Sequence, residues 1–145
     1  MIALIQRVTH ASVCVDQKQI ADIKHGILAL IGIEKLDNEQ SQQKLIKKLL
    51  GYRIFSDEKG QMNLNVQQVR GELLLVPQFT LAADTNSGLR PSLSKACPPD
   101  IATEKFAQFV ELISKLHPQT QQGIFGADMS VSLTNNGPVT FWLQV

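Results

Sequence analysis

Residues 26–33 of this 145-residue chain read Gly-Ile-Leu-Ala-Leu-Ile-Gly-Ile, a continuous apolar run bounded by glycine. A run of this length without polar alternation is typical of a strand that is buried on both faces. Residues 72–76, Glu-Leu-Leu-Leu-Val, carry a similar pattern and are closed by Pro77, which has no N–H for a further ladder bond. The two runs predict that a sheet forms the centre of the fold.

Shorter patterns on either side of these runs predict more strands. The segments alternate between apolar and polar residues or are rich in β-branched residues, and they lie at residues 2–9, 11–15, 19–23, 52–55, 129–133 and 139–145. Residues 82–99 are rich in Gly, Pro and Ser and are expected to form a loop.

Apolar residues at helical spacing predict only two helices. The first follows a cap at Asp37 or Asn38 and ends at Gly51. The second opens at residue 99 or 100 and ends before Pro118. Many strands with two main helices indicate an α+β fold with a mostly antiparallel β-sheet or barrel-like core.

Length and composition predict a single domain over residues 1–145. The formal net charge of +1 excludes a strongly basic nucleic-acid coat, so any RNA binding would rest on a local patch. No apolar run is long enough to cross a bilayer, and no membrane partner is expected. The two cysteines, Cys14 and Cys97, stand far apart, which fits a reducing cytoplasm rather than a disulfide framework.

The sequence points away from several kinds of catalytic site. His10, His25 and His117 are isolated and neither cysteine has a close partner, so no metal and no cofactor are expected. The G-x-S-x-G and phosphate-loop patterns are absent, which removes two large enzyme classes. Nothing nominates a Ser-His-Asp triad.

Candidate catalytic residues follow the buried strand that Pro77 closes. Thr80 stands at a strand-to-loop exit, where active-site groups often lie, and its hydroxyl can donate or accept a bond. Gln78 offers two donors and an acceptor. An ordinary role is open for each as well, a turn or cross-strand bond for Thr80 and solvation for Gln78. Phe79 is expected in the core rather than as a stacking platform for a base.

Basic residues occur at two places of interest. Arg90, Ser92 and Lys95 form a small basic, hydroxyl-rich segment that can grip phosphates, although an ordinary solvated loop explains it equally well. Arg7 lies in the first predicted strand, whose other residues are mostly apolar. It is either a surface residue or a buried donor that fixes backbone carbonyls, since a guanidinium presents five donors in a rigid fork.

The step Gly137-Pro138 precedes the last predicted strand and is unusual in a strand-like run, because Pro cannot donate to a ladder and Gly weakens a strand. One interpretation is an Asn-Asn-Gly turn with a strand that starts at Pro138. The other is a rigid backbone device that points carbonyl oxygens or amides at a ligand. An X-Pro bond is also the one place where a cis peptide costs little.

Taken together and in this order, these motifs resemble the D-aminoacyl-tRNA deacylase family over essentially the whole chain. The family has two signatures, S-Q-F-T-L and N-x-G-P-V-T. The second is intact through Thr140, whereas the first has Pro77 in place of Ser, which removes one hydroxyl and one backbone N–H. Leu93, where the family often has Phe, is a milder departure. The resemblance is carried by residues 1–8, 51–57, 62–66, 78–82, 90–92, 127–129 and 136–142.

The resemblance implies a cytoplasmic homodimer that acts on the aminoacylated 3′ end of tRNA. It implies hydrolysis of the ester that joins a D-amino acid, or mischarged glycine, to the terminal adenosine. In the family the Gly-Pro step, here Gly137-Pro138, is cis and reaches into the partner subunit's pocket, where main-chain carbonyls collide with the side chain of an L-residue. By the same resemblance Arg7 locks this geometry and Met129 and Pro77 belong to the substrate-binding residues.

Hydrolysis needs few protein groups, because an aminoacyl ester is already activated, and positioning together with oxyanion stabilisation can suffice. Backbone amides near Gln78, Phe79 and Thr80 are the expected donors. Thr80 orients the attacking water or, as a second option, acts as nucleophile, and the ribose 2′-hydroxyl replaces a general base. Two other functions stay open: a non-catalytic RNA-binding module of the same fold, in which Pro77 marks lost activity, and an editing domain that removes an L-amino acid.

Overall fold

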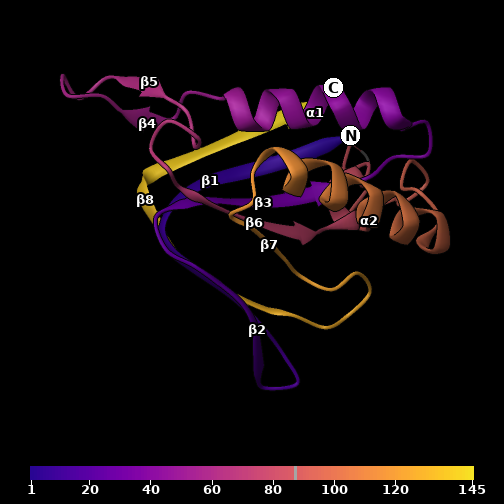
Figure 1. The fold of residues 1–145 in the computed structure, drawn as a ribbon. Coiled ribbons are helices and arrows are strands. Elements are labelled where there is room, and N and C mark those ends of the chain that lie inside the picture. Colours follow the sequence, from indigo (N-terminus) through magenta and orange to yellow (C-terminus); the bar gives the residue numbers. More distant parts are fainter. Residues whose placement is uncertain (87) are drawn as a thin grey trace.

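The computed structural model describes residues 1–86 and 88–145. A curved sheet forms its centre, and the hairpin of β4 and β5 extends away from the body (Figure 1). In chain order the elements are β1 (Ile2–Val15), β2 (Lys18–Ile23), β3 (Gly26–Gly32), α1 (Glu39–Gly51), β4 (Phe55–Ser56), β5 (Met62–Leu64), β6 (Glu72–Pro77), the 3₁₀ turn η1 (Phe79–Ala82), α2 (Pro99–Leu116), β7 (Thr120–Gln122) and β8 (Ser130–Gln144).

The main sheet has the strand order β2-β1-β3-β6-β7, and β8 pairs along β1. All three pairings of β1 are antiparallel, whereas β3–β6 and β6–β7 are parallel. Parallel neighbours need long crossovers, and here α1 with the β4–β5 hairpin and then α2 provide them. The predicted α+β fold with two helices and a mostly antiparallel, barrel-like core is confirmed.

Several predicted strand boundaries are wrong. Residues 2–15 form one strand rather than two, and residues 130–144 form one strand rather than two that a turn separates. The predicted strand at 52–55 lies at Phe55–Ser56. The short elements β5, β7 and η1 were not predicted, because each has only three or four residues and any apolar pattern in them is too short to stand out. Long-range pairing, which local sequence does not encode, sets these limits.

The two helices begin and end where local chemistry allows it. Asn38 caps α1: its side chain accepts a bond from the Ser41 N–H, while the Ser41 hydroxyl accepts from the Asn38 N–H. α2 starts at Pro99, whose missing N–H costs nothing in the first turn, and it stops before Pro118. No helix in the described part of the chain combines the length and hydropathy that a bilayer crossing requires.

The sheet buries apolar side chains on both faces. One face packs against both helices, through residues that include Ala3, Ile5 and Ile27. The other face forms a second core, with Val8, Leu28, Leu74 and Val76, which Val131 and Leu133 of β8 partly cover. β3 and β6 contribute to both cores, which explains why their sequences are apolar without alternation.

A single side chain links the two edge strands of the sheet. The Gln121 amide of β7 accepts from the Asp22 N–H of β2 at 2.8 Å and donates to the Asp22 carbonyl oxygen. These are the two bonds that a neighbouring strand would make, so the side chain substitutes for strand pairing at this edge. The sheet is therefore nearly closed, as the prediction of a barrel-like core required.

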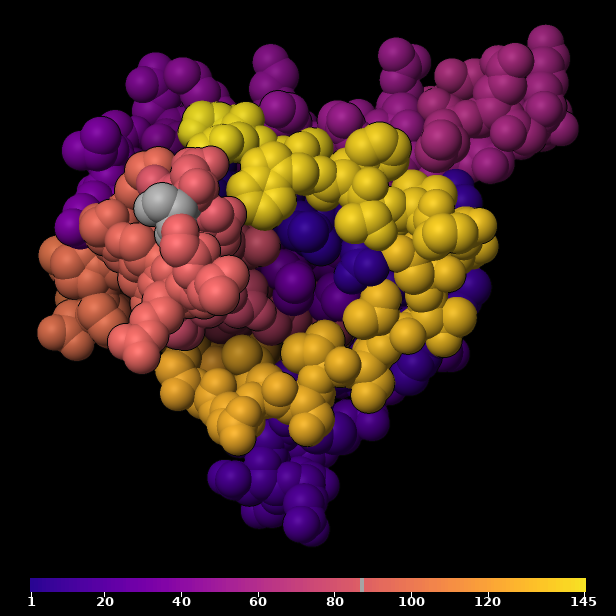
Figure 2. Space-filling view, turned by 180° about the vertical axis from the view of Figure 1, so that it is seen from behind, coloured from indigo at the N-terminus to yellow at the C-terminus, as the bar shows by residue number. Residues whose placement is uncertain are grey.

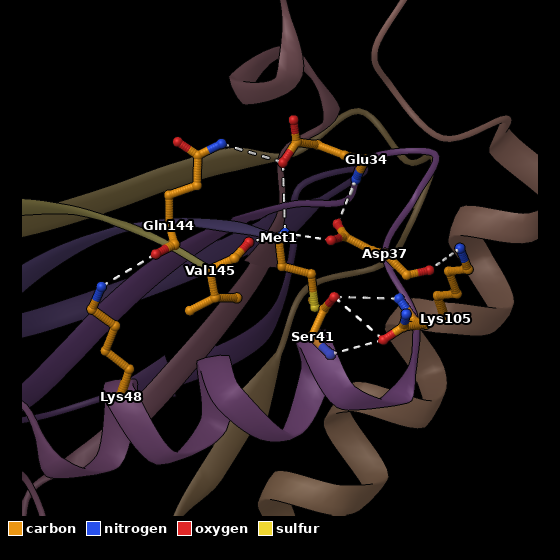
Figure 3. A network of polar contacts seen from close by, with 9 residues as sticks. Met1, Glu34, Asp37, Ser41, Lys48, Lys105, Gln144 and Val145 are labelled. Atoms are coloured by element: carbon orange, nitrogen blue, oxygen red, sulfur yellow. Dashed lines mark hydrogen bonds and ion pairs between the residues drawn. The ribbon is translucent and has the colours of Figure 1, made fainter.

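Polar contacts fix the start of β1 against the loop before α1 and the end of β8 (Figure 3). The Met1 amino group contacts the Asp37 carboxylate, lies 3.6 Å from Glu34 Oε2 and donates to the Val145 carbonyl at 3.3 Å. Lys105 of α2 donates to the Asp37 backbone oxygen. Because Met1 and Asp37 are buried, this ion pair depends on these hydrogen bonds to offset the loss of hydration.

We predict that His117 makes folding stability depend on pH. The ring is 4% exposed and its Nε2–H donates to the Gly71 carbonyl at 2.9 Å. Burial lowers the pKa of the imidazole, and the Gly71 bond only partly opposes this. The unfolded chain therefore binds the proton more readily, so stability is present above the ordinary histidine pKa of about 6.5 and is lost as the pH falls below it.

Urea unfolding of the wild type at pH 7.5 and 5.5 checks this prediction. The free energy of unfolding should be smaller at pH 5.5, and His117→Gln should reduce that difference. His25→Gln, at an exposed ring, is the matched control and should keep the wild-type difference. An unchanged pH dependence in His117→Gln contradicts the assignment.

Candidate active site

A cleft of about 360 Å³ lies at the carboxyl end of β6. This end of a buried strand is where sheet proteins often hold ligands. The opposite side of the molecule from the view of Figure 1 is hollowed, with a floor of β1 and β3 and a rim that includes the last part of β8 (Figure 2). The cleft is lined by Val76, Pro77, Gln78, Phe79, Cys97, Pro99, Phe125, Gly126, Ala127, Met129 and Val131.

The end of β6 positions the predicted catalytic segment. The Gln78 N–H still donates to the Ile31 carbonyl of β3 at 2.7 Å, after which the chain turns into η1. The first N–H groups of a helical turn have no partner within it. In the part of the chain that the structure describes, those of Phe79 and Thr80 donate to no other group. Two free N–H donors therefore stand beside the cleft.

The side chains of this segment are arranged for polar contact. Gln78 Nε2 donates to Thr80 Oγ1 at 2.5 Å, which leaves the Thr80 proton free to donate elsewhere. Thr80 is exposed and lies next to the lining residues rather than among them. Phe79 is 52% exposed, so the expectation that it packs in the core is wrong. The turn η1 carries the ring out of the sheet and onto the cleft wall.

The predicted substrate-binding residues separate into two groups. Pro77 and Met129 lie together in the cleft wall with Gln78 and Phe79. Gly137, Pro138 and Arg7 do not line this cleft and lie at the irregular part of the β1–β8 pairing. The structure thus brings four of the predicted residues together and places three others at a second location on the same chain.

That second location is a bulge in β8. Gln6 pairs with Thr140 and Val8 pairs with Asn135, so residues 136–139 leave the ladder opposite Arg7 alone. The Gly137-Pro138 bond is cis, and both residues are exposed. The interpretation of residues 135–137 as a turn before a new strand is therefore wrong, because β8 continues on the same partner.

Arg7 is not a free surface residue. Its Nε donates to the Asn136 carbonyl at 2.9 Å, and its Nη1 donates to the Ile54 carbonyl at 2.7 Å. Of the two interpretations open from the sequence, the structure agrees with a donor that fixes backbone carbonyls. The bond to the Asn136 carbonyl fixes the first arm of the bulge, the part that precedes Gly137.

The predicted tRNA-binding residues lie in the loop between η1 and α2. Ser92 exchanges two backbone bonds with Asp84, and Lys95 Nζ lies 3.3 Å from Asp84 Oδ2. The Asn86 N–H and then Lys95 lower the pKa of the Asp84 carboxyl, so this partner stays negative. Arg90 is exposed, and within the described residues it makes no ion pair.

Sequence reasoning missed part of the cleft wall. Cys97, Phe125 and Gly126 line it, and no local motif marks these positions; Ala127, which also lines it, belongs to the segment 127–129 that carries the resemblance. Within the described ranges, no three His, Cys, Asp or Glu side chains come together as a metal site.

Comparison with known proteins shows the family to which the chain belongs. The model of the family described as D-Tyr-tRNA(Tyr) deacylase matches residues 4–144. The D-aminoacyl-tRNA deacylases of Photorhabdus laumondii and Escherichia coli O1:K1 are each 57% identical over 145 residues, and that of Francisella tularensis subsp. novicida is 52% identical. In all three pairs the alignment covers 100% of both chains.

Solved structures also match over nearly the whole length of this chain. A structure described as the c-Myc DNA unwinding element binding protein superposes with a TM-score of 0.96 at 36% identity and covers 100% of this chain and 99% of that one. A probable eukaryotic D-amino acid tRNA deacylase gives 0.87 at 13% identity, with 99% and 98% covered, which shows the fold alone. With a family match from residue 4 to residue 144 and relatives that are more than half identical over their full length, this chain belongs to the D-Tyr-tRNA(Tyr) deacylase family of enzymes.

Proposed function

We propose that this protein hydrolyses the ester bond that joins a D-amino acid, or glycine, to the 3′-terminal adenosine of tRNA. The observation that carries the proposal is the 57% identity, without gaps in coverage, to relatives named D-aminoacyl-tRNA deacylase. The cleft supports it, since Gln78, Phe79 and Met129 from separated motifs meet in one wall.

The proposed chemistry uses main-chain donors. Water adds to the ester carbonyl, the negative charge passes to the carbonyl oxygen, and collapse of this intermediate releases the ribose oxygen and the free amino acid. The free N–H groups of Phe79 and Thr80 can bind the oxyanion. The Thr80 hydroxyl, which Gln78 orients, positions the water.

Cys97, which is 6% exposed, is the one described lining residue with an ionisable side chain. We therefore assign the transfer of a proton from the attacking water to the leaving ribose oxygen to the substrate itself, through the ribose 2′-hydroxyl beside the ester. This choice fits an ester that is already activated, for which orientation supplies most of the rate.

We also propose that the site is completed across a homodimer. The step Gly137-Pro138 is exposed and is not among the residues that line its own cleft, as expected if it enters the cleft of the partner subunit. A partly open apolar row on the sheet supports this, because Leu4 pairs with both Leu30 and Trp142, Leu4 and Leu30 are only half-buried, and Trp142 is 50% exposed. Apolar side chains left open in this way favour a second copy as cover.

In this arrangement the carbonyls of the Gly137-Pro138 tip face the α-carbon of the bound aminoacyl group. An L-residue would push its side chain into them, whereas a D-residue points outward and glycine has no side chain to exclude. Rejection by fixed backbone needs no recognition of the accepted side chain. The site should therefore accept many D-amino acids.

The proposed tRNA contacts are Arg90, Ser92 and Lys95. Arg90 can meet a phosphate directly, whereas Lys95 must share its charge with Asp84. Few phosphate contacts and a net charge of +1 predict weak salt dependence.

The experiment that tests the proposed function follows ester loss from D-Tyr-tRNA, Gly-tRNA and L-Tyr-tRNA with purified protein. We expect rapid loss of the first two esters while the L ester is spared. The alternative is a non-catalytic RNA-binding module of the same fold, and a solved relative whose name describes binding to a DNA element gives a non-enzymatic precedent for it. Binding without turnover favours that alternative, and cleavage of the L ester alone favours an L-specific editing domain.

We predict that Gly137→Ala impairs hydrolysis of D-Tyr-tRNA. The backbone at Gly137 has φ +146°, and a Cβ there would lie 2.6 Å from Val139 Cγ2 and 2.8 Å from Val139 N. The bulge must shift, and kcat/KM should fall by about tenfold or more, which corresponds to about 1.4 kcal/mol. Gly60→Ala is the matched control, because it has φ +77° with nothing within 4 Å of its Cβ. Wild-type rates in Gly137→Ala would count against the assignment.

We predict that Gly123→Ala narrows the cleft. A Cβ at Gly123 would lie 2.7 Å from Met129 Sδ, and the flexible Met129 side chain must move. The KM for D-Tyr-tRNA should rise several-fold, whereas in a Met129→Ala background the same change should have little effect, because the clash is gone. Steady-state kinetics of the four proteins measures this coupling, and equal effects of Gly123→Ala in both backgrounds would exclude it.

A further inference from the structure

The bulge of β8 is held from a second side by Asn135. Asn135 Oδ1 accepts from the Val139 N–H at 2.8 Å, and Asn135 Nδ2 donates to Thr140 Oγ1 at 2.8 Å. Val139 is the last residue of the bulge and Thr140 is the first to rejoin the ladder. The Asn135 side chain thus connects the start of the bulge to its end, where the chain rejoins the ladder.

These bonds reach beyond the bulge itself. Thr140 Oγ1 also accepts from Gln6 Nε2 of β1 at 3.3 Å, so the Asn135 amide is connected to the neighbouring strand. Arg7 holds the arm before the tip through the Asn136 carbonyl, whereas Asn135 holds the arm after it through the Val139 N–H. The two residues act on different arms, and neither can replace the other.

The Val139 N–H explains why such a brace is needed. Because residues 136–139 leave the ladder, this donor has no strand partner, and β1 offers it none. Val139 is half-buried, so water satisfies its N–H poorly. Without the Asn135 oxygen, the second arm would turn to find another acceptor and would move the exposed tip with it.

We propose that Asn135 is a positioning residue that fixes where the Gly137-Pro138 tip points and thereby sets the discrimination between D- and L-aminoacyl esters. The inference rests on the proposed function, in which the tip excludes L-residues. Asn135 touches neither substrate nor reacting atoms and acts through the backbone of residues 136–139.

The test compares three variants in the D-Tyr-tRNA and L-Tyr-tRNA assay, each with a melting curve. Asn135→Ala removes both bonds and should lower the ratio of D to L cleavage at least tenfold. Asn135→Asp should restore most of it, because its carboxylate can accept from the Val139 N–H and from the Thr140 hydroxyl. Thr134→Ala, at the exposed neighbouring position on the same strand, should keep the wild-type ratio. A lower melting temperature in Asn135→Ala with an unchanged ratio would overturn the proposal, because it would make Asn135 merely structural.

Amide hydrogen exchange separates this inference from the proposed function. The Val139 N–H should exchange faster in Asn135→Ala than in the wild type, and an unchanged rate overturns the brace whatever the activity. If the wild type cleaves neither ester, the proposed function fails while exchange still decides the brace. If Asn135→Ala does not fold, Thr140→Val takes its place, because it removes one of the two Asn135 bonds. An unchanged ratio of D to L cleavage together with an unchanged exchange rate of the Val139 N–H would then overturn the proposal.

Discussion

The structure depends on one constraint: β8 keeps its pairing with β1 on both sides of residues 136–139, which face Arg7 alone. A segment pushed out of a ladder leaves carbonyls without donors. The Arg7 guanidinium donates to one such carbonyl, that of Asn136, and at the same time to the Ile54 carbonyl before β4. One side chain thus joins β1, the bulge and the segment before β4.

This constraint divides the proposed site into two parts that one protomer does not unite. The cleft lies at the end of β6, and the tip lies at the bulge in the pairing of β1 with β8. In a two-fold dimer the Gly137-Pro138 tip of each subunit would enter the cleft of its partner. Every contact of such an isologous interface occurs twice. The hollowed face in Figure 2 is the surface that the proposed dimer would cover.

Some of this could be read from the sequence, and the reason is local chemistry. Apolar composition alone predicts the buried strands at residues 26–33 and 72–76, and Asn38 and Pro99 mark the helix starts. The bulge was not predictable from local statistics, because Asn-Asn-Gly favours a turn and the strand that overrides it is more than 100 residues away. Phe79 was misjudged for a related reason, since an aromatic residue after a buried strand usually enters the core and only the turn η1 exposes it.

The departure from the family at Pro77 can be weighed by where its missing N–H would point. Leu73 N–H bonds to Gln119 and Gly123 N–H bonds to Leu75, so odd-numbered residues of β6 face β7, whereas Gln78 N–H bonds to Ile31 of β3. β7 ends at Gln122, and proline is tolerated where a ladder stops. The same pattern places the missing Pro77 N–H opposite Gly123, just past the end of β7, so the substitution removes one donor at the end of a ladder. The free N–H groups of Phe79 and Thr80, on which the proposed chemistry relies, are unaffected, so Pro77 alone gives no reason to infer a lost activity.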